Sequence, residues 1–207
     1  MKLAFKSIFL IIGFLLWLSS YSLLAKAPTQ NFTNVLGTNT TSISNYFNKV
    51  ILMQYQKPIF LQINSIGVNA NIEEVGIEKD GSMEVPHNFK NVGWLKTSSK
   101  LGQNGNLVLS GHFDTSNGSP AIFYNLEKVK VGDKINVITQ TDSGLQYDKE
   151  YIISQVYLAD PNNNDHIKDV YKNTLNPTIT LITCNGIWDS VKKEYSSRVV
   201  VKGEMID

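Results

Sequence analysis

The longest apolar run of the chain lies near its N-terminal end, where residues 7–25 contain 19 positions without a charged side chain. As an α-helix at about 1.5 Å per residue, this run measures roughly 28 Å, close to the ~30 Å hydrocarbon core of a bilayer. Lys2 and Lys6 precede it, which favours a cytoplasmic N-terminus and export of the chain that follows. The pattern predicts a cytoplasmic tip at 1–6 and a transmembrane signal-anchor at 7–25.

A cleaved signal peptide is the alternative interpretation of this run, since Ala25-Lys26-Ala27 has the small-x-small form of a cleavage site. Cleavage there would put Pro28 at the first mature position, which is unfavourable. The anchor is therefore preferred, and it predicts a single-pass protein of the plasma membrane with the rest of the chain on the extracellular side.

Residues 26–57 follow a different pattern. Positions 26–42 are polar, rich in Asn and Thr and without a period, which is typical of a stalk. Apolar side chains then recur with helical spacing, at Ile43, Tyr46, Phe47, Val50 and Ile51. Residues 26–57 are therefore predicted to form a polar stalk and a short amphipathic helix.

From Pro58 onward, short runs of strand formers alternate with turns rich in Gly, Asp and Asn. The predicted strands are Ile59–Ile63, Val68–Ile72, Val75–Ile77, Met83–Val85, Asn106–Ser110, Lys134–Ile138, Tyr151–Leu158, Thr178–Thr183 and Val199–Lys202. Pro120–Leu126 suits one or two helical turns. The Asn- and Asp-rich segment 160–176 is long for a connection, as functional or mobile loops often are. Many short strands with few helices predict a closed or nearly closed β-barrel.

Charge and cysteine content narrow the function classes. The net charge of +1 gives no support to nucleic-acid binding, and without Lys2, Lys6 and Lys26 the chain has 16 basic against 18 acidic residues. A single cysteine, Cys184, allows no internal disulfide, so the barrel depends on its core alone.

Cys184 and Arg198 are the chain's only cysteine and only arginine. If the strands before and after the loop Asn185–Ser197 pair, both side chains lie at the same end of the sheet. A thiolate with a nearby guanidinium suits acyl transfer, because the fork of an arginine can hold a carbonyl or oxyanion. A lone cysteine is also often a small buried hydrophobe, and an arginine at a strand end often faces solvent. The residues alone leave both interpretations open.

His112 is the histidine best placed for proton transfer, because it follows an apolar strand and Gly111. His87, in a turn, and His166, in the polar segment, are interpreted as surface residues or as core histidines with satisfied hydrogen bonds. Asp114 is two positions after His112, so on a strand both would share a face and the carboxylate could orient the imidazole.

Three motifs in this order resemble those of the sortases, the cysteine transpeptidases of bacterial surfaces. The stretch 180–184, TLITC, is similar to the family's TLxTC-type motif, and Gly111-His112 is similar to its GH motif. Arg198 matches the arginine that opens the strand after the cysteine's loop. The resemblance covers about Pro58 to Glu204 and implies a mainly β, closed or nearly closed sortase-type barrel of about eight strands with a few short helices, at 58–207.

Within the family, the stretches 111–114 (GHFD) and 120–126 (PAIFYNL) look most like class F and class D/E. Pilin-polymerising members typically carry an Asp-Pro-aromatic lid before the barrel, and the residues between Ala27 and Lys57 contain no match. The resemblance therefore favours anchoring of surface proteins over pilus assembly.

The resemblance also implies a mechanism and partners. Cys184 attacks the Thr carbonyl of an LPXTG-like sorting signal, His112 protonates the departing amine, and Arg198 steadies the carbonyl and oxyanion. A peptidoglycan precursor amine, or water, then resolves the thioester. The implied setting is the bacterial plasma membrane, bound through the N-terminal helix, and no cofactor is implied.

Ordinary pKa values add a kinetic expectation. With values of ~8.5 and ~6.5, about 10% of thiols and about 10% of histidines are in the active form near pH 7.5, so that ~1% of molecules carry both if the two groups titrate independently. For an uncoupled pair, that fraction corresponds to about 2.7 kcal/mol of barrier. The sequence predicts a slow enzyme with a bell-shaped pH profile.

Thr183 and Asp114 are the candidate substrate-binding residues. Thr183 precedes the nucleophile and could position substrate, although an ordinary strand threonine is equally compatible with the pattern. Trp188 could line a substrate groove or pack in the core. Some family members bind calcium, but the spacing of the acidic residues matches no ligand motif and no metal is assigned; these are Glu73, Glu74, Asp160, Asp165 and Asp169.

Two other function classes remain at this stage. Cys184-Asn185-Gly186 echoes the C-x-G of caspases, but the preceding Gln-Ala is missing and His112 lies 72 residues upstream rather than ~50. Papain-like enzymes have the cysteine before the histidine, which is the wrong order. A membrane-tethered β-domain that binds wall or host ligands, with an incidental cysteine, is the non-enzymatic alternative.

Overall fold

The computed structural model describes residues 56–206 except 80, 142 and 143. The predicted cytoplasmic tip, signal-anchor and stalk with its amphipathic helix, apart from Gln56 and Lys57, lie outside the described residues. No helix within the described part of the chain combines the length and the apolar character needed to span a bilayer.

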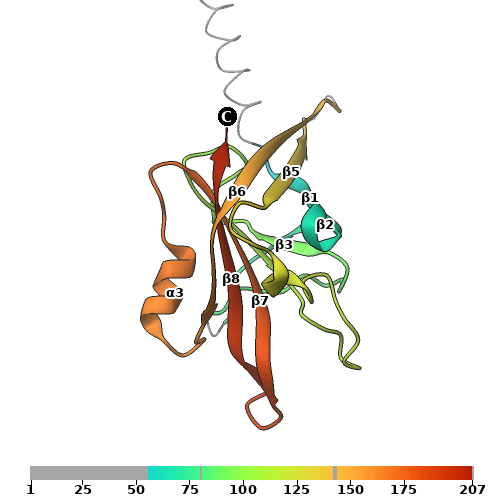
Figure 1. Cartoon of the computed structure of the whole chain (residues 1–207), viewed down its shortest axis with the longest axis vertical. Coiled ribbons are helices and arrows are strands. Elements are labelled where there is room, and N and C mark those ends of the chain that lie inside the picture. Colours follow the sequence, from blue (N-terminus) through green and yellow to red (C-terminus); the bar gives the residue numbers. More distant parts are fainter. Residues whose placement is uncertain (1–55, 80, 142–143, 207) are drawn as a thin grey trace, which may run out of the picture. The chain divides into compact units, whose positions relative to one another are not determined.

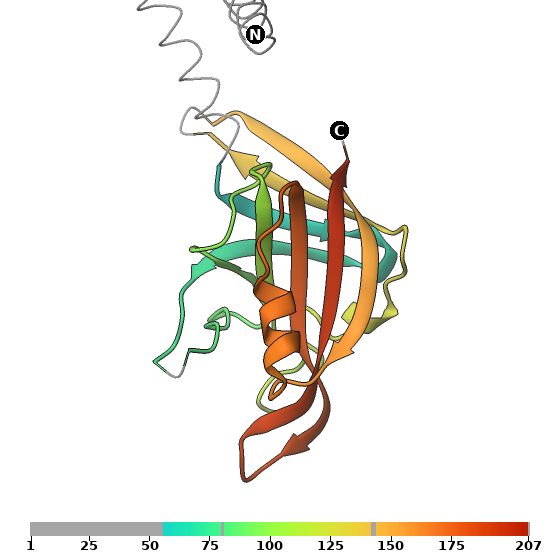
Figure 2. The same cartoon turned by 90° about the vertical axis from the view of Figure 1, so that its left-hand side faces the viewer.

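Eight strands form a closed barrel in the order β1-β2-β3-β4-β7-β8-β6-β5 (Figures 1 and 2). Neighbouring strands are antiparallel except for the parallel pairs β2–β3 and β4–β7. The strands are β1 (Pro58–Ile63), β2 (Val68–Val75), β3 (Val92–Leu95), β4 (Gly105–Gly111), β5 (Lys134–Gln140), β6 (Gln146–Ala159), β7 (Pro177–Asp189) and β8 (Glu194–Ile206). The predicted mainly β barrel of about eight strands is confirmed.

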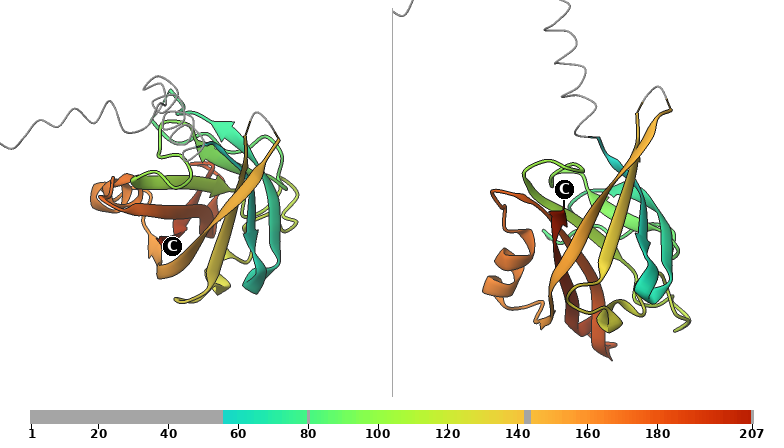
Figure 3. Two further views of the ribbon diagram at one scale, coloured as in Figure 1. Left: turned by 90° about the horizontal axis from the view of Figure 1, so that it is seen from above. Right: turned by 45° about the horizontal axis from the view of Figure 1, so that its top comes forward.

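Within residues 56–206, three helices interrupt the strands. These are the short 3-10 helices η2 (Asn64–Ile66) and η3 (Leu126–Lys128), and the α-helix α3 (Asn164–Tyr171). The last of these forms part of the segment 160–176, which the sequence predicted only as a long loop. The side chain of Asn163 caps α3 by accepting from the backbone N–H groups of Asp165 and His166. Figure 3 shows α3 outside the ring of strands, beside β4 and β7.

The two faces of β4, β7 and β8 have different neighbours. On β8, Val199 and Val201 belong to the main core inside the barrel, whereas Val200 packs with Ala159 and Val170 in a second cluster beneath α3. Because successive side chains of a strand point to opposite faces, residues in step with Val200 lie on the outer face. The same alternation puts Ile182 of β7 on that face, where it packs against the second cluster.

The connection between β7 and β8 differs from the sequence prediction. In place of a loop at 185–197, the two strands continue as a hairpin as far as the pair Asp189 and Glu194. The register shifts between Asn185 and Trp188, where Gly186 has a φ of 91°. A Cβ at Gly186 would lie 2.3 Å from the Ser196 Oγ atom, so the bulge requires glycine. The hairpin projects from the barrel at the bottom of Figures 1 and 2.

The predicted strands differ from the observed ones in detail. The sequence missed β3, whose four residues are all buried and therefore show no alternation of polar and apolar positions. The predicted strand Met83–Val85 contributes only an isolated bridge between Met83 and Ile77.

Candidate active site

Three neighbouring strands bring Cys184, Arg198 and His112 to one region of the barrel, with Cys184 within β7, Arg198 within β8 and His112 directly after β4. Cys184 on β7 and Arg198 on β8 are direct partners in the antiparallel register. On the neighbouring pair of strands, Ser110 of β4 is the partner of Ile182 of β7. His112 comes two positions after Ser110, and Cys184 comes two positions after Ile182. The two residues therefore lie at the same level, on the outer side of the barrel.

Thr183 links the strands that carry the candidate nucleophile and histidine. Its buried hydroxyl donates to the Gly111 carbonyl oxygen at 2.7 Å, just beyond the last backbone pair between β4 and β7. Because Thr183 and Gly111 directly precede Cys184 and His112, this bond fixes the position of His112 along β4 relative to Cys184 on β7. The role of Thr183 in binding substrate stays a prediction.

The glycine before His112 is required by packing. A Cβ at Gly111 would lie 2.4 Å from the Cδ2 atom of Phe123, a fully buried side chain of the main core. The ring of Phe123 thus occupies the space that any larger residue at 111 would need.

The ring of His112 is fixed by two contacts. Its Nε2 atom lies 2.8 Å from the Pro86 carbonyl oxygen, and its ring centroid lies 4.5 Å from that of Phe89. A carbonyl oxygen can only accept a hydrogen bond, so Nε2 carries a proton in this arrangement. Nδ1 is the atom left to exchange protons with a substrate.

The thiol of Cys184 is partly exposed and lies in a mixed electrostatic environment. Burial raises the pKa of the Cys184 thiol, the Arg198 guanidinium opposes this, and the carboxylates of Asp114 and Glu194 raise the pKa further. The thiol therefore predominates at neutral pH, and the thiolate is the minor form.

Arg198 is held by its own hairpin. Its Nη2 atom lies 3.0 Å from the Glu194 Oε1 atom, and Nη1 donates to the carbonyl oxygens of Tyr195 and Ser197. A guanidinium has five N–H donors, so two of them have no partner among the described residues. These two can bind a carbonyl or an oxyanion.

One cleft reaches Cys184, and a second reaches its register partner Arg198. The first, which we call the histidine cleft, has a volume of about 720 Å³. It is lined by Val85, Phe89, His112, Phe113, Asp114, Thr115, Ser116, Gly118, Cys184, Trp188, Lys193 and Tyr195.

The second, which we call the arginine cleft, has a volume of about 180 Å³ and is more apolar. It is lined by Ser82, Ala159, Asp160, Pro161, His166, Ile167, Val170, Tyr171, Ile182, Glu194 and Arg198. His166, which was interpreted as a surface residue or a satisfied core histidine, is half-buried here, and its Nδ1 atom accepts from the Asp160 N–H at 2.9 Å. His87, interpreted in the same way, has a side chain that is 94% exposed.

Asp114 is bound to a residue that the sequence did not single out. Its Oδ2 atom accepts from the Tyr195 hydroxyl at 2.5 Å, and this bond raises the pKa of Tyr195 to about 12. Tyr195 also packs against the rings of Trp188 and Phe113, with centroid distances of 5.1 and 5.7 Å. The predicted orientation of His112 by Asp114 and the predicted contact of Asp114 with substrate stay predictions.

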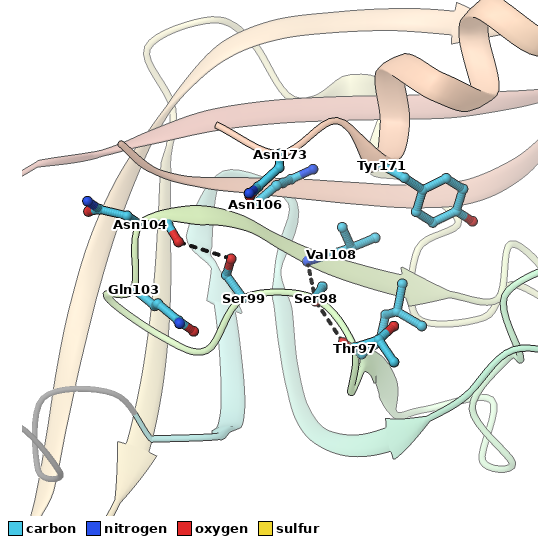
Figure 4. A pocket seen from close by; sticks show the side chains of 10 residues that line it. Thr97, Ser98, Ser99, Gln103, Asn104, Asn106, Val108, Tyr171 and Asn173 are labelled. Carbon is cyan, nitrogen blue, oxygen red and sulfur yellow. Dashed lines mark hydrogen bonds between the residues drawn. The ribbon is translucent and has the colours of Figure 1, made fainter. Parts of the chain in front are cut away.

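A third cleft, of about 390 Å³, lies between the β3–β4 connection and the end of α3 (Figure 4). Its hydroxyl and amide groups hold the backbone of that region together. Ser98 Oγ donates to the Leu95 carbonyl oxygen and accepts from Val108 N–H, and both ends of the Asn106 amide are hydrogen-bonded. This cleft is structural.

Within the described residues, no group of three or more His, Cys, Asp or Glu side chains is arranged to hold a metal ion. Several acidic residues considered for calcium are bound to other side chains instead. Glu74 pairs with Lys57, and Asp169 binds Lys202 and the Tyr157 hydroxyl.

Comparison with known proteins points to one family. The family model "Sortase domain" matches residues 61–206. A search of curated proteins gave no match.

Solved structures give a consistent picture. The Clostridium perfringens Sortase D5 transpeptidase is 26% identical, with a TM-score of 0.53 over 79% of this chain and 89% of that one. Streptococcus agalactiae sortase C1, in complex with MTSET, is 25% identical, with a TM-score of 0.53 over 72% and 67% of the two chains. Listeria monocytogenes sortase A, at 23% identity, shares the fold with a TM-score of 0.52 over 72% and 86%.

Proposed function

Because this chain belongs to the sortase family of cysteine transpeptidases, we propose that Cys184 is its nucleophile, His112 its general acid and base, and Arg198 the group that holds the substrate carbonyl. The observation that carries this assignment is the register pair of Cys184 and Arg198. A carbonyl carbon above the sulfur then has its oxygen within reach of the guanidinium, as acyl transfer requires.

The first half of the proposed reaction forms a thioester. The Cys184 thiolate attacks the carbonyl carbon of the Thr in an LPXTG-like signal, and Arg198 stabilises the resulting oxyanion. As the C–N bond breaks, the His112 imidazolium gives its proton to the departing Gly amine. The products are the acyl-enzyme, neutral His112 and a free amine.

The second half regenerates the enzyme. A peptidoglycan precursor amine attacks the thioester carbon, a C–N bond forms, the C–S bond breaks and His112 takes a proton from the attacking nitrogen. Cys184 leaves as the thiolate and His112 is again the imidazolium.

The arginine cleft suits the acyl part of such a signal. Its apolar wall combines Ile167 and Val170 of α3 with Ile182 of β7, and it ends at Arg198. Leu and Pro side chains would be buried against this wall while the Thr carbonyl reaches the guanidinium.

The charge states of the site favour slow turnover. Burial raises the pKa of the Cys184 thiol, so only a small fraction of molecules carries the nucleophilic thiolate near neutral pH. The pH profile of kcat/KM is bell-shaped on this proposal, and a flat profile from pH 6 to 9 contradicts the roles of His112 and Cys184.

The proposal extends to location and subclass. The apolar run 7–25 would anchor the protein in a bacterial plasma membrane and place the barrel on the extracellular side, next to the wall precursors. The motifs GHFD and PAIFYNL support a class F or class D/E enzyme that anchors surface proteins.

Mass spectrometry of the full-length chain in detergent tests this function. The protein is incubated with LPXTG-like peptides and candidate amines, beside a Cys184→Ala variant. We expect cleavage after Thr and transfer to the amine, both absent in the variant. If no LPXTG-like peptide is cleaved, the substrate proposal is wrong.

A further inference from the structure

We propose that the histidine cleft is the binding site of the acceptor amine and that Asp114 is the counter-ion of the acceptor's ammonium group; this inference rests on the proposed function. The histidine cleft is four times the volume of the arginine cleft, at about 720 against about 180 Å³. Cys184 lines the histidine cleft, whereas Arg198 lines the arginine cleft.

The two clefts receive the two groups that the broken bond had joined, the acyl group and the amine. The carbonyl is held by Arg198, so the acyl chain lies toward the arginine cleft. The departing amine must be within hydrogen-bond reach of His112, which lines the histidine cleft. The second step is chemically the reverse of the first, so the incoming amine exchanges its proton with the same imidazole from the same cleft.

The charge of the acceptor requires a partner in that cleft. A lysine amine has a pKa near ~10.4 and an α-amine near ~7.7–8.0, so an acceptor reaches the enzyme largely as an ammonium ion. Asp114 is the only carboxylate among the residues that line the histidine cleft. It lies close enough to Cys184 to influence the thiol electrostatically.

The hydrogen bonding of Asp114 leaves room for such a ligand. Tyr195 donates to Oδ2, which fixes the carboxylate, while Oδ1 has no partner within the described part of the chain. A primary ammonium bound there would lose one proton to water. His112 would accept the second proton as the amine attacks the thioester.

The walls around Asp114 also suit a cation. Tyr195, which binds Asp114, packs against Trp188 and Phe113, so aromatic rings lie near the carboxylate, and the Trp188 side chain is half exposed. An ammonium group is attracted to the face of an aromatic ring. Lys193 from the turn of the hairpin lines the same cleft and disfavours acceptors with a second positive charge.

The test measures how the thioester divides between two products, the amide formed by aminolysis and the acid formed by hydrolysis. Full-length protein in detergent is given an LPXTG-like peptide with triglycine, which carries an ammonium, or with hydroxylamine, which is neutral at pH 7.5. The ratio of aminolysis to hydrolysis is measured at fixed amine. Because both products come from the same acyl-enzyme, this ratio is independent of how fast the thioester forms.

In Asp114→Asn we expect the triglycine ratio to fall about tenfold while the hydroxylamine ratio changes less than about twofold. Asp148→Asn, an exposed carboxylate on β6, is the matched control and leaves both ratios unchanged. Tyr195→Phe removes the hydroxyl but keeps the carboxylate, so it retains the triglycine ratio within about threefold.

Three outcomes overturn the inference. These are an unchanged triglycine ratio in Asp114→Asn, an equal fall for triglycine and hydroxylamine, and an equal fall in Asp114→Asn and Tyr195→Phe. The last would mean that only the bond between Asp114 and Tyr195 matters. Failure of the wild type to form any thioester instead contradicts the proposed function itself.

Discussion

Cys184 and Arg198 face each other across the β7–β8 pair, so the sulfur and the guanidinium are positioned by backbone register rather than by a flexible loop. Register between antiparallel strands is fixed by the pattern of buried side chains, because a slip of one residue would turn the core positions outward. The proposed nucleophile and its carbonyl-binding partner are therefore set by the same packing that closes the barrel.

The guanidinium of Arg198 should matter through its shape as well as its charge. In Arg198→Lys the charge remains, but a lysine cannot match the arrangement of N–H groups that binds Glu194, two backbone carbonyls and the substrate. We expect kcat/KM to fall about 10²–10³-fold, as for loss of an oxyanion donor. Arg198→Lys should leave the alkylation pH profile of Cys184 nearly unchanged, whereas Arg198→Met should shift it to higher pH. Activity within about threefold of wild type in Arg198→Lys would contradict this role.

The pKa of Cys184 should respond to Glu194. This carboxylate raises the pKa of the thiol, so Glu194→Gln should lower it and increase the thiolate fraction at neutral pH. The measurement is the rate of iodoacetamide alkylation against pH, which should rise at lower pH in the variant. Glu204→Gln, at the far end of β8, is the control and should not shift the profile. A shift to higher pH in Glu194→Gln would show that its bond to Arg198 outweighs its charge.

The close contact between Gly111 and Phe123 predicts that a larger residue at 111 destabilises the fold and that a smaller residue at 123 partly restores the stability. Gly111→Ala places a methyl group 2.4 Å from the Phe123 ring and should destabilise the fold by about 1–3 kcal/mol. Thermal unfolding of Gly111→Ala, Phe123→Leu and the double variant measures the coupling. We expect the double variant to be more stable than the sum of the single effects predicts. If the stability changes of the two single variants simply add in the double variant, the backbone at 111 moves to accommodate the methyl group and the Phe123 ring does not.

The anchoring of α3 should depend on pH. Lys202, and then the Tyr157 hydroxyl, lower the pKa of Asp169. A lowered carboxyl pKa stabilises the fold above the ordinary carboxyl range, and this contribution is lost as pH falls through the folded value. Asp169 is partly exposed, so Asp169→Asn should cost about 1 kcal/mol or less at pH 7 and almost nothing in acid. The free energy of unfolding is measured for Asp169→Asn and for the control Asp148→Asn, at pH 7 and in acid. A difference between the two variants that does not change with pH would contradict the predicted contribution of the Asp169 carboxylate.

The sequence predicted the barrel because most of its strands show the period of two or a run of β-branched residues. It missed β3 because all four residues of that strand are buried. It also missed α3, although Ile167, Val170 and Tyr171 have helical spacing, because Asn and Asp dominate the segment around them. The sequence predicted a loop at Asn185–Ser197, whereas Gly186 forms a bulge and the strands continue beyond it.

The candidate site was predictable in part. Cys184, His112 and Arg198 stand in motifs that resemble one family, and the family assignment is confirmed. The caspase-like and non-enzymatic alternatives are not needed for a chain of this family and fold. The bond between Asp114 and Tyr195 joins residues 81 positions apart, and no local pattern signals it. It arises from the register of the hairpin.

The central claim is that Cys184 forms a thioester with the sorting signal, and isolation of that acyl-enzyme tests it most directly. Full-length protein is mixed with an LPXTG-like peptide, stopped in acid within the first turnover and analysed by intact mass and peptide mapping. We predict an adduct of the peptide up to its Thr, located on Cys184, released by hydroxylamine and absent in Cys184→Ala. Cleavage of the peptide by Cys184→Ala at the wild-type rate, or an adduct on another residue, would contradict the account.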